Sequence, residues 1–299
     1  MSRRGWLLFS VMGLIWGVPY LMIKVAVGAL SPASLVFLRT LIAALLLLPL
    51  AAARGQLRPL LPYWRPMLAF AAVELALPWL LLASAEQRLS SSLAGLLIAA
   101  VPLVGALLGW ATGGERLGAL RQAGMLIGLA GVAALVGFDL HAGDVWAIGQ
   151  MAIVVVGYAV GPFILVRYLS ELPGLGVTAG ALAVTALGYL PVAVVQLPRH
   201  WPEPKVIGAV LGLAVICTAA AFLLFFQLIA EVGAIRATVI TYINPAVAVA
   251  LGVLLLGEPF TVGIAVGFAL VLTGSVLATR RQPAPAAVAE DPEVQQAPV

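Results

Sequence analysis

Ten long stretches of the sequence carry almost no charged residues, and they constrain the fold more than any other feature. Seven contain no charge: 89–114, 122–138, 145–166, 172–198, 206–230, 237–257 and 259–279. Three more, 6–28, 33–53 and 66–85, each contain one charged residue. A helix needs about 20 apolar residues to cross about 30 Å of hydrocarbon, and each stretch is near or above that length. We therefore expect an all-α integral membrane protein with ten transmembrane helices.

The composition supports a membrane protein and argues against several other classes. Hydrophobic residues make up 63% of the 299 positions and charged residues 9%, whereas a soluble domain is about half apolar and about a quarter charged. The single cysteine, Cys217, excludes an intramolecular disulfide, and two isolated histidines, His141 and His200, do not make a multi-histidine site. We predict no metal, no cofactor and, because the basic residues are scattered at the ends of apolar stretches, no nucleic-acid partner.

The distribution of basic residues predicts the orientation. One set of helix ends holds Arg3, Arg4, Arg54, Arg58, Arg65, Arg116, Arg121, Arg167, Arg236, Arg280 and Arg281, and the other holds Arg88, Arg199 and Lys205. By the positive-inside rule, the protein is expected to lie in a bacterial-type inner membrane with both termini in the cytoplasm. The tail, 282–299, is rich in Pro, Ala and acidic residues and is predicted to be disordered.

The first apolar stretch has a second interpretation. It follows Arg3-Arg4 and is succeeded by small residues, as in a secretory signal. However, the apolar region of a signal is usually shorter, about 7–15 residues. We therefore expect this stretch to be the first transmembrane helix.

An internal repeat is visible at a constant offset of 143 residues. The offset aligns Pro19 with Pro162, Lys24 with Arg167, Pro102 with Pro245, Gly109 with Gly252, Gly114-Glu115 with Gly257-Glu258, Gly124 with Gly267, and Gly131 with Gly274. It divides the chain into 1–140 and 141–281, with five predicted helices in each. Because five is odd, the second unit enters the membrane from the opposite side. Inverted repeats of this kind recur in secondary transporters, with the substrate between the halves.

The same residues carry a family resemblance. Trp16-Gly17 followed by Lys24, Pro32 and Arg39, together with the series from Pro102 to Gly131 that recurs from Pro245 to Gly274, resembles the EamA-domain family of the drug/metabolite transporter superfamily. The resemblance implies ten helices in two inverted repeats around a central cavity. It also implies export of amino acids and related metabolites, with aromatic amino acids in the YddG-like branch. The second copy departs from the pattern, with Ala159-Val160 in place of the Trp-Gly pair.

Glu74 is the first candidate for a functional residue. It lies in the middle of its apolar stretch, opposite Cys217 in the repeat alignment. An ionised side chain at the bilayer centre costs about 2.5–3.5 kcal/mol on insertion scales, so such residues usually face a cavity or a partner. Glu74 is expected either to titrate or bind a substrate amine, or to tie helices together as a protonated or paired carboxyl.

Lys24 and Arg39 lie within a turn or two of the predicted periplasmic face. Long basic side chains at this depth snorkel to the lipid headgroups. We therefore favour structural anchoring for both residues over gating, folding or substrate contact, although the family pattern includes them.

A set of aromatic and amide residues completes the predicted site. Its members are Trp16, Tyr20, Trp79, Tyr158, Phe163, Phe222, Gln227, Tyr242 and Asn244. Aromatic walls with a few polar groups suit a flat, amphipathic ligand such as an aromatic amino acid. The alternative is that these residues face lipid or anchor the interface. Tyr20 and the Tyr242–Pro245 segment are the favoured members.

Small residues and two acidic residues are assigned to structure. Four Gly-x3-Gly pairs, beginning at Gly105, Gly124, Gly208 and Gly263, are expected to bring helices close together. Glu115 and Glu258 are each expected to bond to the start of a neighbouring helix.

The sequence thus predicts a secondary transporter that moves a small metabolite, most readily an amino acid, by alternating access. The partners are the substrate and the bilayer, and a monomer is compatible with the sequence. The remaining alternatives are a multidrug, nucleotide-sugar or lipid-linked sugar carrier, a structural membrane subunit and an intramembrane enzyme. The last is disfavoured because neither histidine lies in a span and no two intramembrane carboxylates face each other. The energy source stays open.

Overall fold

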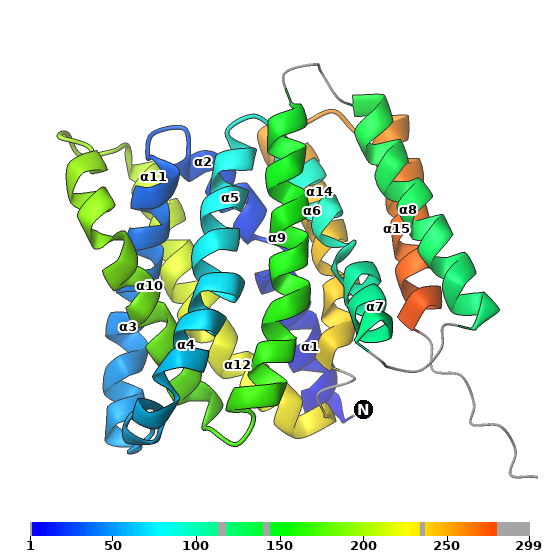
Figure 1. Ribbon diagram of the computed structural model, residues 1–299. Helices are drawn as coiled ribbons and strands as arrows, with labels where there is room; N and C mark the ends of the chain where they lie inside the picture. The colour runs from blue at the N-terminus through cyan, green and yellow to red at the C-terminus, as the bar shows by residue number, and fades with distance from the viewer. Residues whose placement is uncertain (1, 113–117, 140–143, 234–236, 280–299) are drawn as a thin grey trace, which may run out of the picture.

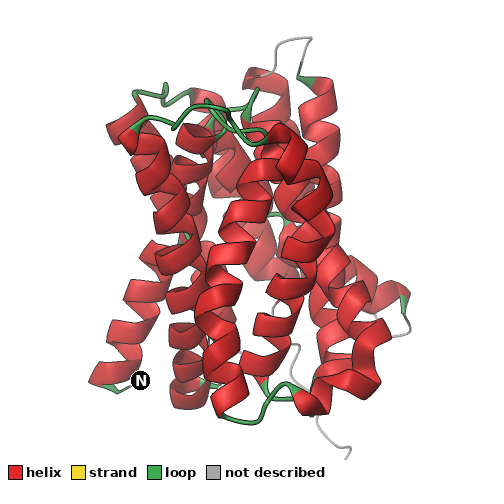
Figure 2. Ribbon diagram, turned by 90° about the vertical axis from the view of Figure 1, so that its left-hand side faces the viewer, coloured by secondary structure: helices red, strands yellow, loops and turns green. Residues whose placement is uncertain are grey.

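The computed structural model describes residues 2–112, 118–139, 144–233 and 237–279, and every regular element in them is a helix (Figure 2). Nine helical segments are long and apolar enough to cross a membrane, and a tenth, Ile240–Leu256, is shorter. The ten predicted stretches all coincide with these segments. The predicted tail, 282–299, and Glu115 lie outside the described residues.

The segments are built from the following elements. The first half contains α1 (Arg3–Ile15) and α2 (Pro19–Ala26), α3 (Pro32–Ala53), a span made of η1 (Arg58–Tyr63), α4 (Trp64–Phe70), η2 (Ala71–Ala76) and α5 (Leu77–Glu86), then α6 (Ser91–Ile98) and α7 (Val101–Ala111), and α8 (Ala119–Asp139). The second half contains α9 (Val145–Ile164) and η3 (Leu165–Leu169), α10 (Gly174–Gln196), a span made of α11 (Pro204–Leu211), η4 (Gly212–Ala220) and α12 (Ala221–Val232), then η5 (Thr238–Tyr242) and α14 (Asn244–Leu256), and α15 (Val262–Thr279).

Prolines mark the places where three spans are interrupted. α2, α7 and α14 carry Pro19, Pro102 and Pro245 in their first turns. A proline has no backbone N–H, and the first turn of a helix is where that donor is not needed. Pro102 and Pro245 are partners in the repeat alignment, so the offset seen in the sequence is also an offset between two helix starts.

Helices that are distant in sequence pack side by side. The main pairs are α3 with α10, α8 with α15, α5 with α9, α6 with α14, and α1 with α12 (Figure 1). Each pair joins one helix from each half of the chain. α1 therefore belongs to the bundle, as expected for a first transmembrane helix, and buries Phe9 and Met12 against its neighbours.

The closest of these pairs, α8 with α15, depends on glycine. A Cβ on Gly131 would lie 2.6 Å from the backbone nitrogen of Val271, and one on Gly124 would lie 2.5 Å from the nitrogen of Ala278. The packing role predicted for Gly124 is confirmed. The same prediction is wrong for Gly105 and its partner in the pair, Gly109, because a Cβ on either would meet nothing within 4 Å.

The sequence likewise predicted packing at the pair Gly208 and Gly212. A Cβ on Gly208 would meet nothing within 4 Å, whereas a Cβ on Gly212 would lie 2.6 Å from Cε of Met22 on α2. The Gly-x3-Gly spacing therefore identifies a smooth helix face, but does not show that another helix of the chain covers it.

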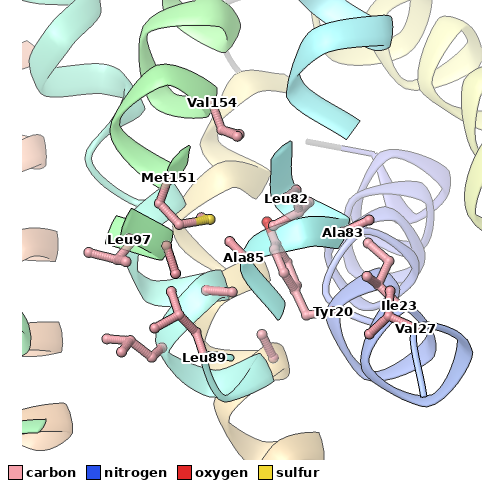
Figure 3. Close-up of a cluster of buried hydrophobic side chains, with 14 of the residues drawn as sticks. Tyr20, Ile23, Val27, Leu82, Ala83, Ala85, Leu89, Leu97, Met151 and Val154 are labelled. Atoms are coloured by element: carbon pink, nitrogen blue, oxygen red, sulfur yellow. The ribbon is translucent and has the colours of Figure 1, made fainter. Parts of the chain in front are cut away.

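The largest buried cluster closes one end of the bundle, which we call the Lys24 end. It combines residues of both halves, mainly from α2, α5, the turn after α5, α6, α9, α11, η4 and α14. It includes Tyr20, Ile23, Leu82, Leu89, Leu97, Met151, Val154, Leu213 and Val249. Figure 3 shows Tyr20, Leu82, Ala85 and Met151 pointing toward one another in this cluster. Apolar burial at the Lys24 end therefore holds the two halves together.

Glu258 adds a polar tie at the same end. Its carboxylate accepts hydrogen bonds from the backbone N–H groups of Ser91 and Ser92, at 2.7 and 2.9 Å, and from the Ser92 hydroxyl at 2.5 Å. The first N–H groups of a helix have no intrahelical acceptor, and the helix dipole favours a negative charge there. The predicted bond from Glu258 to a neighbouring helix start is confirmed.

Candidate functional site

Arg39 is held inside the protein rather than at the membrane surface. Its side chain projects from α3 and is 7% exposed. Nε donates to the Thr218 hydroxyl at 2.9 Å, and the guanidinium carbon lies 3.6 Å from the centre of the Trp79 ring. The snorkelling expected from its position is therefore wrong. Arg39 instead makes a cation–π contact with Trp79 of α5 and a hydrogen bond to Thr218 of η4, an arrangement that suits the planar and weakly hydrated guanidinium.

Glu74 lies in a π-helical segment, η2, packed against α9. Its Oε2 atom is buried and has no hydrogen-bond partner among the described residues. The carboxyl faces Gly161, where an added Cβ would overlap Oε2 and lie 2.8 Å from Cδ. π-helical turns are rare and often occur at functional sites, because one extra residue redirects the side chains. In η2, the extra residue accompanies a carboxyl group that faces a glycine.

A second π-helical segment, η4, occupies the corresponding place in the other half. The residue aligned with Glu74 is Cys217, which is buried in η4 beside Thr218. The Thr218 hydroxyl donates to the Leu213 carbonyl, five residues earlier, at 2.7 Å, and accepts from Arg39. The two segments thus contribute unlike chemistry. η2 contributes the Glu74 carboxyl group, whereas η4 contributes Cys217 at the aligned position and, next to it, the Thr218 hydroxyl that binds Arg39 of α3.

Tyr158 connects these groups to the aromatic residues of the site. It is partly buried and packs against both the Lys24-end cluster and the cluster that contains Trp79. Tyr158 lies within electrostatic range of Glu74 and Arg39, and Tyr20 lies within range of Tyr158 and Arg39. The structure therefore brings together five of the predicted residues, from α2, α3, η2, α5 and α9. We call them the central site: Tyr20, Arg39, Glu74, Trp79 and Tyr158.

Three other predicted residues lie away from the central site. Trp16 packs in the α1–α12 cluster, with its ring 4.7 Å from that of Phe225 and 6.0 Å from that of Phe222. The Lys24 ammonium donates to the main-chain carbonyls of Glu86 and Leu89, both at 2.7 Å. Lys24 thus anchors the end of α5 rather than a headgroup. Phe163, on α9, is 44% exposed.

The amide and tyrosine candidates of α12, η5 and α14 make structural contacts. Gln227 is exposed and accepts from the Arg4 guanidinium at 3.4 Å. The Tyr242 hydroxyl lies 3.0 Å from the Thr279 hydroxyl of α15. The amide nitrogen of Asn244, suitably oriented, donates to the carbonyls of Gly13 and Ile240 at 3.1 and 3.0 Å, so it joins α14 to α1.

Sequence reasoning missed Thr218, Gly161 and Glu86. Thr218 follows Cys217, the repeat partner of Glu74, so the alignment pointed to it. Gly157 and Gly161 form a further Gly-x3-Gly pair that encloses Tyr158. Glu86 was excluded because the predicted apolar stretch ended at 85, whereas the helix continues through it.

The central site is buried and combines unlike chemical groups. It contains a cationic guanidinium, aromatic surfaces and a carboxyl oxygen without a hydrogen-bond partner among the described residues. Among the described residues, no group of three His, Cys, Asp or Glu side chains is placed to hold a metal ion. Charged groups inside a membrane protein face a substrate pathway or a partner. A bundle of apolar helices around such groups is the arrangement of a membrane transporter.

The chain belongs to the EamA-like transporter family, whose model matches residues 3–137 and again residues 144–280. It is 24% identical to an uncharacterised transporter of Bacillus subtilis, YvbV, over 96% of this chain and 95% of that protein. It is 30% identical to an uncharacterised inner membrane transporter of Escherichia coli, YedA, over 82% of this chain and 80% of that protein.

Two further likenesses agree with this assignment. A WAT1-related chloroplastic protein of Arabidopsis thaliana is 26% identical over 88% of this chain and 66% of that protein. A solved crystal structure shares the fold with a TM-score of 0.66 at 25% identity, over 93% of this chain and 97% of that one. The protein is thus a multi-pass membrane transporter, and its family points away from an enzyme.

Proposed function

We propose that this transporter carries amino acids with aromatic or other hydrophobic side chains by alternating access between two inverted five-helix repeats. The observation that carries the proposal is the central site, where the Arg39 guanidinium lies over Trp79, Oε2 of Glu74 has no partner among the described residues, and Tyr158 interacts electrostatically with both. An amino acid has both charges and an apolar side chain, so it complements this site in three ways.

Each part of an amino acid has a matching group. Within the described part of the chain, the hydrogen bond of Arg39 uses Nε alone, so its terminal nitrogens can bind a carboxylate in the two-pronged geometry typical of arginine. Glu74 can accept from the ammonium. Trp79, Tyr158 and Tyr20 supply aromatic surface for the side chain.

The inverted arrangement is supported by features that recur at the 143-residue offset. These are the π-helical segments η2 and η4 and the helix-starting prolines Pro102 and Pro245. The family model also matches the chain twice. The bias of basic residues toward one set of helix ends supports cytoplasmic termini in an inner membrane.

A phosphate-bearing substrate fits the central site less well. A nucleotide sugar or lipid-linked sugar calls for several cations, whereas Arg39 is the one cation among the five residues of the central site. Lys24, the other intramembrane base expected from the sequence, donates to the carbonyl of Glu86, the last residue of α5, and to that of Leu89 in the turn after it.

The test is transport by purified protein in liposomes. Uptake of radiolabelled tryptophan, phenylalanine and threonine is measured with and without a pH gradient, for the wild type and Glu74→Gln. We expect saturable movement of tryptophan and phenylalanine, weakened by the substitution. A folded protein that moves none of the three contradicts the amino-acid proposal and favours the drug or sugar carriers.

A further inference from the structure

A second intramembrane carboxyl group, Glu86, lies outside the central site. It is the last residue of α5, its side chain is fully buried, and neither carboxyl oxygen has a hydrogen-bond partner among the described residues. The Ser91 hydroxyl, at the start of α6, is also buried without a partner. An ionised carboxylate without partners is strongly disfavoured in such a place, whereas a neutral carboxyl is tolerated far better.

The charged and titratable groups that interact electrostatically with Glu86 come from three elements. From α2 come Lys24 and Tyr20, from α9 comes Tyr158, and from the loop after α14 comes Glu258. The Lys24 ammonium donates to two main-chain carbonyls, one of them that of Glu86 itself, rather than to the Glu86 carboxyl. Glu258, a like charge when both are ionised, belongs to the other half of the chain.

We propose that Glu86 is a proton-binding site of the transport cycle, protonated while the Lys24 end is closed and deprotonated when that end opens. On opening, the carboxyl O–H bond breaks, the proton passes to water, and the electron pair stays on the carboxylate. The Lys24 ammonium then leaves the two carbonyls and pairs with this carboxylate. Closing reverses each step and takes up one proton.

The surroundings of Glu86 explain how the proton controls the Lys24 end. Two ionised carboxylates in one buried site repel, so a charge on Glu86 opposes the approach of Glu258. Glu258 is the residue that ties the second half of the chain to α6. Loss of the proton therefore weakens both the tie between the halves and the cap on α5, and it shifts the equilibrium toward the open state.

The proposal rests on transport, which the family shows, and not on the identity of the substrate. Its first test therefore needs no substrate. Infrared difference spectra of the purified protein are recorded as the pH is raised, and the carbonyl band of protonated carboxyl groups is followed. The wild type is compared with Glu86→Gln, with Glu74→Gln, and with a control, Glu203→Gln, whose carboxylate is exposed and paired with Lys205.

We expect Glu86→Gln to remove part of the protonated-carboxyl band that the wild type loses on titration. Glu203→Gln should leave the band unchanged. Glu74→Gln identifies the part of the band that comes from the other buried carboxyl group, so that it is not assigned to Glu86. A band that is identical in the wild type and Glu86→Gln overturns the proposal. If Glu86→Gln does not fold, Glu86→Asp keeps the carboxyl and should shift the titration, and an unshifted titration overturns the proposal equally.

The second test follows coupling in liposomes. Exchange of labelled against unlabelled tryptophan at equal pH requires the Lys24 end to open and close, and accumulation driven by a pH gradient requires net proton movement as well. Because a neutral glutamine stands in for the protonated, closed form, Glu86→Gln should lower both exchange and gradient-driven accumulation at least about tenfold and remove the dependence of the exchange rate on pH. Accumulation equal to the wild type, or wild-type accumulation that ignores the gradient, overturns the proposal. Absence of tryptophan exchange in the wild type contradicts the proposed substrate instead, and the infrared result still decides the role of Glu86.

Discussion

Gly161→Ala is the substitution that most sharply tests the geometry around Glu74. An alanine Cβ at this position of α9 would overlap Oε2 of Glu74 and lie 2.8 Å from Cδ and 3.0 Å from Cβ of the same residue. The carboxyl group must therefore move, or α9 must move away from η2. Overpacking of this kind costs about 1–3 kcal/mol, which corresponds to roughly 5- to 150-fold in an equilibrium constant.

This free-energy cost either displaces the Glu74 carboxyl group or moves α9 away from η2, and two assays distinguish these outcomes. If the Glu74 carboxyl is displaced, KM for tryptophan transport in liposomes rises by roughly 5- to 150-fold and the melting temperature in detergent is unchanged. If the helices separate, the melting temperature falls. Gly149→Ala is the matched control, because it lies on the same helix and its Cβ would meet nothing within 4 Å. A Gly161→Ala protein with wild-type KM and wild-type melting temperature refutes this reasoning.

Three further substitutions test other contacts. Glu258→Gln should lower the free energy of unfolding by about 2–4 kcal/mol, because the charge-assisted hydrogen bonds to the N–H groups at the start of α6 are lost. Thermal melts in detergent measure this loss, and melts that match the wild type contradict the prediction. Gly274→Ala places a Cβ 2.6 Å from the Gly124 carbonyl oxygen and should cost about 1–3 kcal/mol in the same melts, whereas Gly105→Ala should cost nothing. Arg39→Lys loses the planar contact with Trp79 and should raise KM for tryptophan by roughly 30-fold, the equivalent of about 2 kcal/mol, and an unchanged KM excludes Arg39 from substrate binding.

The sequence predicted the helices well because crossing a membrane leaves a strong composition signal. All ten apolar stretches are helical segments, and Pro102 and Pro245, which the 143-residue offset aligns, both lie in the first turn of a helix. The bond made by Glu258 was also predictable, because an acid after a glycine-terminated helix has few other backbone donors within reach. The positive φ of Gly257, 67°, shows why glycine precedes it.

The direction in which each side chain points, toward lipid or toward another helix, was much harder to predict. When a helix is apolar all round, no amphipathic stripe shows which side is buried. This is why Trp16, Trp79 and Phe163 looked equivalent in the sequence, although their surroundings differ. The depth of Arg39 suggested lipid contact, but Thr218 and Trp79 come from spans distant in sequence. The π-helical turns η2 and η4 also have no sequence signature that distinguishes them from regular helix, and they decide where Glu74 points.

The central claim is that Arg39 and Glu74 hold the two charges of one amino acid. The most direct measurement is competition against labelled tryptophan flux by two analogues, tryptamine, which lacks the carboxylate, and indole-3-propionate, which lacks the ammonium. In the wild type, we predict that both analogues compete at least about tenfold more weakly than tryptophan, because each loses one charged contact. In Glu74→Gln, we predict that tryptophan loses its advantage over indole-3-propionate but keeps its advantage over tryptamine. Equal competition by all three compounds, or a Glu74→Gln protein that still distinguishes tryptophan from indole-3-propionate, contradicts the account.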